Sequence, residues 1–357
     1  MSVPVNYTIA GNEARMQTAS GVFLGPLATL AQQRKTWTPG LLAGVLWRAL
    51  TNIGRQHEIF KLLKLPDFEA LIQTDPRFAL KYLTHDYLSR GFSVSERAAC
   101  FVHHYKRLHA KLPGALLRKI LYRDISLFDA DEDGHRLGIA LSLSRPKDHV
   151  GNHSVEIQHD KEGELSLYLR VDRDIVFVLS FTIVPGRVVK SEAADVLLIT
   201  RLQGAKGYFR QIHIATKALH DVAPGAMLVA ALQGIAEPLG IGEIACIRGA
   251  DQSSYCDKWE HSFKTAYDDF WADLGVELNT ANFFVSSVPI QEKPLASIKQ
   301  GHKLRTREKR IFKRQVAEEV SNLLRELCQG EQHTVPELHS APAPAILGHR
   351  SAQVLES

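Results

Sequence analysis

The stretch that most constrains the fold is an apolar segment, residues 196–200, that leads into a glycine-containing turn, residues 203–207. From Arg210 the apolar residues recur at helical spacing, with Ile212 and Ala215 on one side of the expected helix. Glycines let the backbone approach a ligand closely, and the first amides of a helix carry free N–H groups and the positive end of the helix dipole. This order of strand, turn and helix therefore predicts a site for phosphate groups. The alternative is that the glycines only close a strand–helix corner.

The length and charge of the chain limit its class. A chain of 357 residues exceeds what one ordinary core supports, so we expect one large domain or two coupled ones. A formal net charge of +4 does not require nucleic acid, and no nucleic-acid partner is expected. The four cysteines include no C-x-x-C pair, which argues against a disulfide framework and favours the cytoplasm. No apolar run approaches the roughly 18 residues that span a bilayer, so any membrane association would be peripheral, at the inner membrane.

The hydrophobic pattern divides the chain into five parts. A loose segment (residues 1–35) precedes a helical region (36–123), and an α+β sheet domain follows (124–295). A basic amphipathic helix (296–328) and a disordered tail (329–357) complete the chain. The expected fold class is α+β, with the helical N-terminal region packed on a mixed, largely antiparallel sheet that has covering helices.

The strands are expected where apolar residues alternate. The segment 175–184 is apolar nearly throughout, which predicts a strand covered on both faces. The predicted strands are residues 135–144, 155–158, 165–171, 175–184, 196–200, 244–247 and 283–288, and helices are predicted at 210–222, 224–239 and 261–274.

The last predicted helix carries a cluster of positive charge in its first half, opposed there only by Glu308. Its cations are Lys303, Arg305, Arg307, Lys309, Arg310, Lys313 and Arg314. One interpretation is a solvated face of a helix whose apolar stripe packs on the core. The other is a surface for an anionic membrane, where each clustered Lys or Arg adds on the order of 1 kcal/mol of binding free energy.

Several polar clusters indicate no specific chemistry. His135, His149, His153 and His159 are close in sequence, but they lie between expected strands and not on one helical face, so no metal site is predicted. The adjacent carboxylates of Asp268 and Asp269 point in different directions on a helix, which disfavours paired acid–base work.

Four sets of residues resemble the VirK/YbjX family of Gram-negative bacteria, in order and spacing, over roughly residues 40–320. They are His104-Tyr105, Leu202-Gln203-Gly204 with Gly207, Tyr267-Asp-Asp-Phe-Trp271 with Leu274-Gly275, and the basic segment Lys303–Arg314. The family has no established reaction. The resemblance implies support of outer-envelope integrity, antimicrobial-peptide resistance and virulence from the cytoplasmic side, with some members membrane-associated. The resemblance also makes His104 and Tyr105 candidate catalytic residues, together with Tyr267. The alternative for His104 and Tyr105 is an interhelical hydrogen bond.

The chain departs from this family at two places. Val276 stands where the family usually has a second glycine. Gln252-Ser-Ser254 stands where the family tends to carry a histidine after a strand, so no role of that histidine can be transferred.

The order of elements in the second half is also similar to GNAT-type acyltransferases. This resemblance implies that the backbone of the glycine turn binds the pyrophosphate of acyl-CoA, through residues Gln203, Gly204, Ala205, Lys206, Gly207 and Tyr208. GNAT enzymes often place a tyrosine, as general acid, four residues before the glycine that ends the later helix. Here Trp271 occupies that position, and Tyr267 lies one turn earlier. The two hypotheses are an envelope-maintenance protein and an acyltransferase that uses acyl-CoA or acyl carrier protein on an envelope substrate.

Overall fold

The computed structural model describes residues 39–74, 76–132, 134–144 and 161–330. The predicted loose segment 1–35, the strand 155–158, three of the four clustered histidines and nearly all of the predicted tail lie outside the described residues.

The first third of the described chain is helical. Its helices are α3 (Pro39–Thr51), α4 (Ile53–Leu63), α5 (Pro66–Thr74), a 3-10 helix (Pro76–Leu83), α6 (Val94–Lys111) and α7 (Gly114–Tyr122). The sequence determines the start of α6, because Ser93 and Glu96 form a reciprocal capping box that satisfies two free amides. Prolines begin α5 and the 3-10 helix, as expected for a residue that has no N–H to donate.

A seven-stranded sheet follows, in the order β1-β2-β3-β4-β5-β6-β7. Its strands are β1 (Ile125–Glu132), β2 (His135–Leu143), β3 (Leu165–Val171), β4 (Asp174–Pro185), β5 (Asp195–Gly204), β6 (Glu243–Cys246) and β7 (Phe284–Ser287). All neighbouring strands are antiparallel except β5 and β6, which are parallel. The predicted α+β class with a mixed, largely antiparallel sheet is confirmed.

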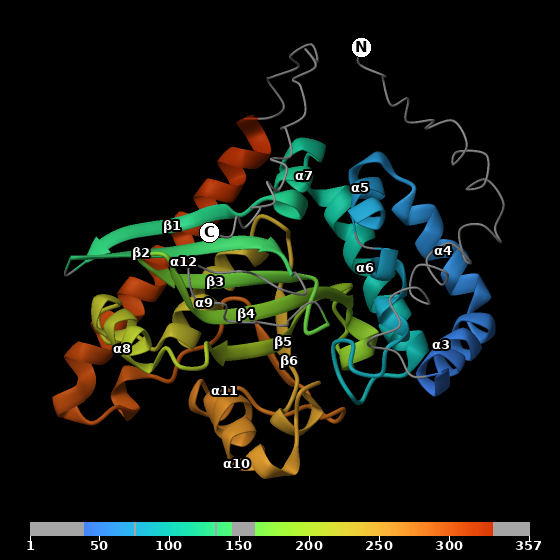
Figure 1. The fold of residues 1–357 in the computed structure, drawn as a ribbon. Coiled ribbons are helices and arrows are strands. Elements are labelled where there is room, and N and C mark those ends of the chain that lie inside the picture. Colours follow the sequence, from blue (N-terminus) through green and yellow to red (C-terminus); the bar gives the residue numbers. More distant parts are fainter. Residues whose placement is uncertain (1–38, 75, 133, 145–160, 331–357) are drawn as a thin grey trace, which may run out of the picture.

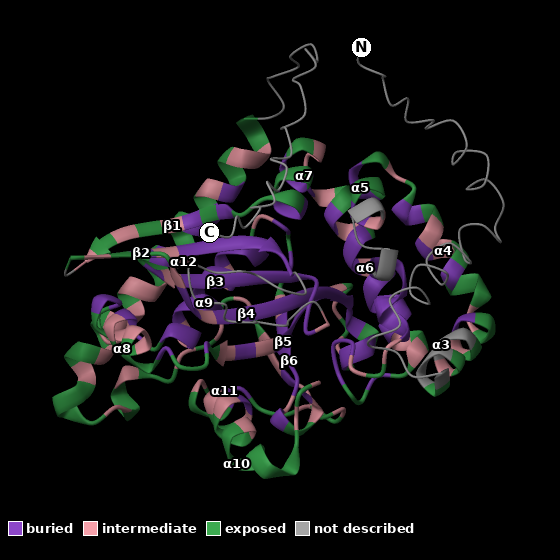
Figure 2. Cartoon of the chain, viewed as in Figure 1, coloured by how far each residue is buried: buried purple, intermediate pink, exposed green. Residues whose placement is uncertain are grey.

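Five described α-helices follow β5, and they are α8 (Phe209–Ala218), α9 (Pro224–Ala236), α10 (Glu260–Phe263), α11 (Phe270–Asp273) and α12 (Lys303–Gly330). Of these, α8, α9 and α12 contact strands of the sheet. In Figure 1, α9 and α12 lie behind the sheet, whereas α3–α7 gather at one end of its strands. Nearly every residue of α9 is buried, because the helix is enclosed between β4 and α12. Figure 2 shows the buried residues concentrated in β2–β5 and in the helices that contact them.

The main differences from the sequence prediction are an additional edge strand, a later start of the basic helix and an interrupted helix. The edge strand β1 was not predicted, because most of its residues after Leu127 are polar and incompletely buried, which weakens the apolar alternation. The basic helix begins at Lys303 rather than near residue 296, after two short 3-10 turns. The predicted helix 261–274 is interrupted by a π-helical stretch, Lys264–Asp269, between α10 and α11.

Candidate functional site

The strands β5 and β6 run side by side for only three residues. Their parallel register pairs Leu197 with Ile244 and ends at Ile199 with Cys246. The strand β5 continues to Gly204, still paired with β4. Its last part therefore has a free edge on the side where β6 has ended, and this edge borders the residues described below.

The predicted glycine turn lies at the end of this free edge. Gln203 and Gly204 belong to the strand, the Ala205 N–H donates to the Val176 carbonyl at 2.9 Å, and α8 begins at Phe209. The exposed residues of the turn include Lys206 and Gly207. Among the described residues no side chain caps the N-terminus of α8, so its first amides and the positive end of its dipole have no side-chain acceptor.

Gly204 and Gly207 are each required in this turn, for different physical reasons. Gly207 has a φ of +87°, in the left-handed region that residues with a Cβ rarely adopt, and there is open space around it. A Cβ on Gly204 would lie 2.8 Å from Cδ1 of Ile212, so this glycine lets α8 pack on the strand. Gly204 therefore closes the corner, and Gly207 shapes the exposed turn.

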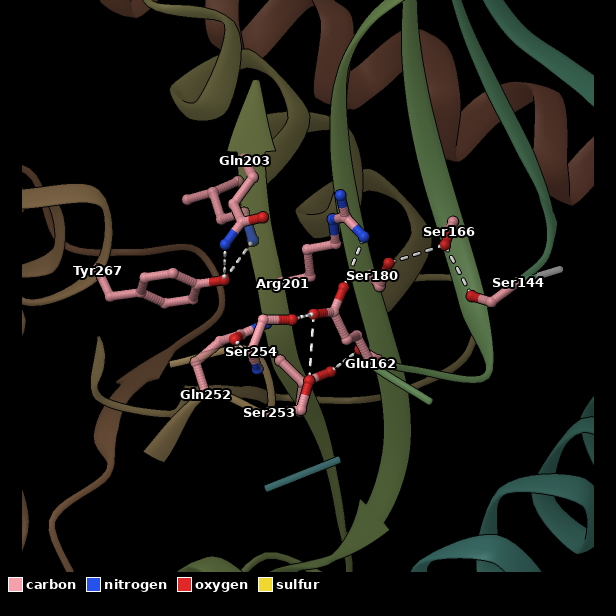
Figure 3. A network of polar contacts seen from close by, with 12 residues as sticks. Ser144, Glu162, Ser166, Ser180, Arg201, Gln203, Gln252, Ser253, Ser254 and Tyr267 are labelled. Atoms are coloured by element: carbon pink, nitrogen blue, oxygen red, sulfur yellow. Dashed lines mark hydrogen bonds and ion pairs between the residues drawn. The ribbon is translucent and has the colours of Figure 1, made fainter. Parts of the chain in front are cut away.

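Tyr267 lies against the free edge of β5, as Figure 3 shows. Its hydroxyl oxygen accepts hydrogen bonds from the Leu202 backbone N–H at 3.4 Å and from Nε2 of Gln203 at 3.2 Å. Burial, followed by the charge of Glu162, raises the pKa of Tyr267, so the phenol keeps its proton. Among the described residues no hydrogen bond is shown that uses this proton. Tyr267 is thus a buried donor with its proton available.

The π-helical stretch explains why Tyr267 is at this edge. A π turn inserts one residue into a helix and changes which side chains share a face. Trp271, at the position where a GNAT enzyme often has its tyrosine, is 1% exposed and packs edge to face on Phe270. The structure therefore brings Tyr267, rather than residue 271, to Gln203.

Glu162, three residues before the start of β3, is the centre of a second polar group next to Tyr267 (Figure 3). Its carboxylate pairs with Nη1 of Arg201 at 2.5 Å. It also accepts hydrogen bonds from Gln252 at 2.5 Å, Ser254 at 2.8 Å and Ser253 at 3.1 Å. Glu162 is buried, whereas Ser254 is exposed, so Ser254 connects the carboxylate to the surface.

The sequence did not reveal Glu162. It lies between the predicted strands 155–158 and 165–171, and its partners are 39 to 92 residues away. One signal was present in the adjacent Gly163, whose φ is +154° and whose Cβ would lie 2.8 Å from the Phe181 nitrogen. That close approach holds the Glu162 segment against β4. The Gln252–Ser254 segment, noted as a departure from the VirK/YbjX pattern, supplies three of the four partners.

A row of serine hydroxyls crosses the sheet beside Arg201. Ser166 is hydrogen-bonded to Ser144 at 2.7 Å and to Ser180 at 2.9 Å. The strand register places Ser166 opposite Ser180, and Ser180 opposite Arg201. This face therefore carries hydroxyl groups beside the Glu162–Arg201 pair, where a leucine or phenylalanine would normally fill a core.

His104 and Tyr105 lie elsewhere, where α6 meets the sheet. Nδ1 of His104 accepts the Ile183 N–H at 3.0 Å, and the Tyr105 hydroxyl donates to Glu164. Burial lowers the pKa of His104 well below its usual range, so the ring is neutral. Burial and the Glu164 carboxylate raise the pKa of Tyr105, which therefore stays protonated. Both side chains join the helical region to the sheet, and neither touches the glycine turn.

The seven predicted cations of α12 divide into two sets. Arg305 pairs with Asp221 at 2.8 Å, and Glu292 pairs with Arg310 at 3.4 Å and with Lys313 and Arg314 at 2.9 Å each. No ion pair among the described residues is shown for the other three, Lys303, Arg307 and Lys309.

The described residues contain no cluster of three or more metal-ligating side chains. Of the clustered histidines only His135 is described, and it contacts Asp172 at 3.0 Å. No helix of the described segments is long and apolar enough to cross a membrane.

The family model described as "Protein of unknown function (DUF535)" matches residues 45–320, most of the chain. The VirK/YbjX family is the DUF535 family, so the resemblance inferred from four sets of residues is confirmed. No match was found among the curated proteins or among the solved structures.

Proposed function

We propose that this chain, which belongs to the DUF535 family, supports the outer envelope from the cytoplasmic side by transferring an acyl group. The acyl donor is acyl-CoA or an acyl carrier protein, and the acceptor is an envelope substrate. The donor's phosphates bind at the exposed turn around Gly207 and the start of α8, and its thioester lies along the free edge of β5. The protein would then act as a GNAT-like acyltransferase.

The observation that carries this proposal is the buried hydroxyl of Tyr267 beside the free edge of β5. The raised pKa of Tyr267 keeps the phenol fully protonated before the reaction. The phenol can then donate a hydrogen bond to the sulfur and release its proton to it as the carbon–sulfur bond breaks. The two hydrogen bonds that this oxygen accepts also support the tyrosinate that would form, because both donors already point at it.

The residues present account for each bond and each proton in this acyl transfer. A nitrogen or oxygen of the acceptor attacks the thioester carbonyl carbon and forms the new bond, and the carbon–sulfur bond breaks. The thiolate takes the proton of Tyr267. The acceptor loses its proton to the hydroxyl of Ser254, which passes its own proton to Glu162. Exchange with water then returns Tyr267 and Glu162 to their starting states.

Calorimetric titration with palmitoyl-CoA, followed by an assay for released thiol, tests the proposal. Tyr267→Phe keeps the ring, so we expect unchanged affinity and a loss of about 10²-fold or more in thiol release. Tyr122→Phe is the matched control, because its hydroxyl donates to the backbone carbonyl of Asp67, far from the site. Absence of both heat release and a shift in melting temperature with palmitoyl-CoA would exclude the acyltransferase.

Two substitutions at Gly207 test whether donor binding requires the positive φ of the turn or the glycine itself. Asparagine tolerates positive φ, and valine does not. We expect Gly207→Asn to retain palmitoyl-CoA binding and Gly207→Val to weaken it. Equal affinities for the two variants would place the donor elsewhere.

A second proposed function is peripheral binding of the first half of α12 to an anionic inner membrane. Leu304 and Ile311 are 69% and 44% exposed, and they lie seven residues apart on one helical face. Lys303 and Arg307 flank them and form no ion pair among the described residues. We expect co-sedimentation with liposomes that rises with anionic lipid and falls in Arg307→Glu. Binding that ignores lipid charge would contradict the electrostatic interpretation.

A further inference from the structure

A groove runs between α9, α12 and the extended segment 288–294, with a volume of about 950 Å³. The two helices touch where Gly234 meets Ala317, since a Cβ on that glycine would lie 2.3 Å from the Ala317 carbonyl oxygen. Ile290 ties the third wall to α9, because its N–H donates to Gln233 at 2.8 Å. None of the glycine-turn residues lines this groove, so it is separate from the proposed acyl donor site.

The floor of the groove is apolar. Its lining includes small and branched side chains of α9 and of the extended segment, namely Ala226, Val229, Ala230, Val288, Pro289 and Ile290. A volume of this size lies within the range of small-molecule sites and exceeds what a free phosphate ion needs.

The groove is lined by four cations (Lys293, Arg310, Lys313 and Arg314) and three carboxylates (Glu237, Glu292 and Glu318). Arg310, Lys313 and Arg314 converge on a single carboxylate, that of Glu292, at 3.4, 2.9 and 2.9 Å. Burial alone would raise the pKa of Glu292, but the bonds from Lys313 and Arg314 more than offset this, and the pKa is lowered. Glu292 therefore stands as an anion inside a ring of three cations.

The groove continues into a smaller hollow of about 280 Å³ at the N-terminus of α9. Pro224 is the first residue of this 13-residue helix, and its first turn contains no acidic residue. No side chain in the described segments caps it. The uncapped amides add the positive end of the helix dipole to the charge of Lys309 and Arg310. Besides Glu292, two acids line this hollow: Asp221, which is paired with Lys217 and Arg305 at 2.8 Å each, and Asp273.

We propose that this groove binds one lipid that carries a phosphate, with its acyl chain on the apolar floor and its phosphate among Arg310, Lys313 and Arg314. Three convergent cations suit the three oxygens of a phosphate, and arginine forks bind phosphate in two places. Glu292 occupies the position of the phosphate and competes with it. The groove thus holds a single lipid molecule, which is distinct from adsorption of α12 on a membrane surface.

Because Glu292 competes with the phosphate, removing its charge should raise the affinity for the lipid. A damaged fold would not produce this increase. Oleoyl lysophosphatidate is titrated calorimetrically below its critical micelle concentration into the full chain. We expect one bound molecule per chain. Glu292→Gln keeps the size of the side chain and removes the competing charge, so its affinity should rise about tenfold. Lys313→Glu should lower the affinity at least tenfold.

The controls test whether binding requires the groove itself, rather than only the positive charge of α12 or only the acyl chain of the lipid. Arg307→Glu alters an exposed cation of the same helix outside the groove, and it should change the affinity less than twofold. Oleoyl lysophosphatidylcholine has the same chain with a zwitterionic head group, and inorganic phosphate has no chain; both should bind at least tenfold more weakly.

Four results would overturn the proposal. They are an unchanged or lower affinity in Glu292→Gln, an equal loss in Arg307→Glu and Lys313→Glu, equal binding of lysophosphatidylcholine, and equal binding of free phosphate. Because Tyr267 and Gly207 do not line the groove, Tyr267→Phe leaves this titration unchanged whether or not the protein is an acyltransferase.

Discussion

The buried carboxylate of Glu164 offers the sharpest test of how the helical region is attached to the sheet. It is 0% exposed, its Oε2 lies 2.5 Å from Nζ of Lys81, and the hydroxyls of Tyr87 and Tyr105 also donate to it. Lys81→Met removes the only cation of this group and keeps most of the side-chain volume. The carboxylate is then buried with two neutral donors. Breaking one side of a buried ion pair costs about 3–5 kcal/mol, and we expect this loss in the free energy of unfolding.

The matched control is Lys161→Met. Lys161 pairs with Asp86 at 2.9 Å, but its side chain is 42% exposed, so its loss should cost less than about 1 kcal/mol. The double variant Lys81→Met/Glu164→Gln removes both buried charges, and it should recover about 2 kcal/mol of the single loss. Urea unfolding followed by circular dichroism measures all three. The reasoning fails if Lys81→Met is no worse than Lys161→Met, or if the double variant recovers nothing.

Two further predictions concern stability. The folded pKa of His104 lies below its unfolded value of about 6.5, so its contribution is present above that pH and is lost as pH falls, by up to about 1.4 kcal/mol per unit. Unfolding from pH 7.5 to 5 should therefore be less pH-dependent in His104→Asn than in the parent, and equal slopes would refute this. Gly234→Ala forces α9 and α12 apart at Ala317 and should cost about 1–3 kcal/mol, whereas Gly242→Ala, with open space around it, should cost little. Thermal melts compare the two, and equal shifts would contradict the close contact.

The position of His104 and Tyr105 changes how a family motif should be interpreted. The resemblance implies a functional role for them, and their described contacts are with the backbone of Ile183 and with Glu164. Tyr105→Phe separates the alternatives. We expect a loss of about 1.5–3 kcal/mol of stability with unchanged affinity for palmitoyl-CoA.

The elements that the sequence determined are those set by local spacing. Alternation predicted β2 and β3, the apolar run predicted the buried strand β4, and the glycine turn was placed correctly between β5 and α8. These succeeded because side-chain direction repeats every two residues in a strand and about every 3.6 in a helix, so the pattern is readable without the rest of the chain. Gly207 belongs with them, because its positive φ is a local requirement.

Only the tertiary structure decided which distant side chains meet. Glu162 pairs with Arg201 and accepts a hydrogen bond from Ser254. Glu292 faces cations about twenty residues further along the chain. The π turn that carries Tyr267 to Gln203 depends on packing between elements 64 residues apart, and no local pattern encodes it. In the sequence, a charged residue that becomes buried and paired cannot be distinguished from one that stays on the surface, because burial and pairing arise only when the chain is folded.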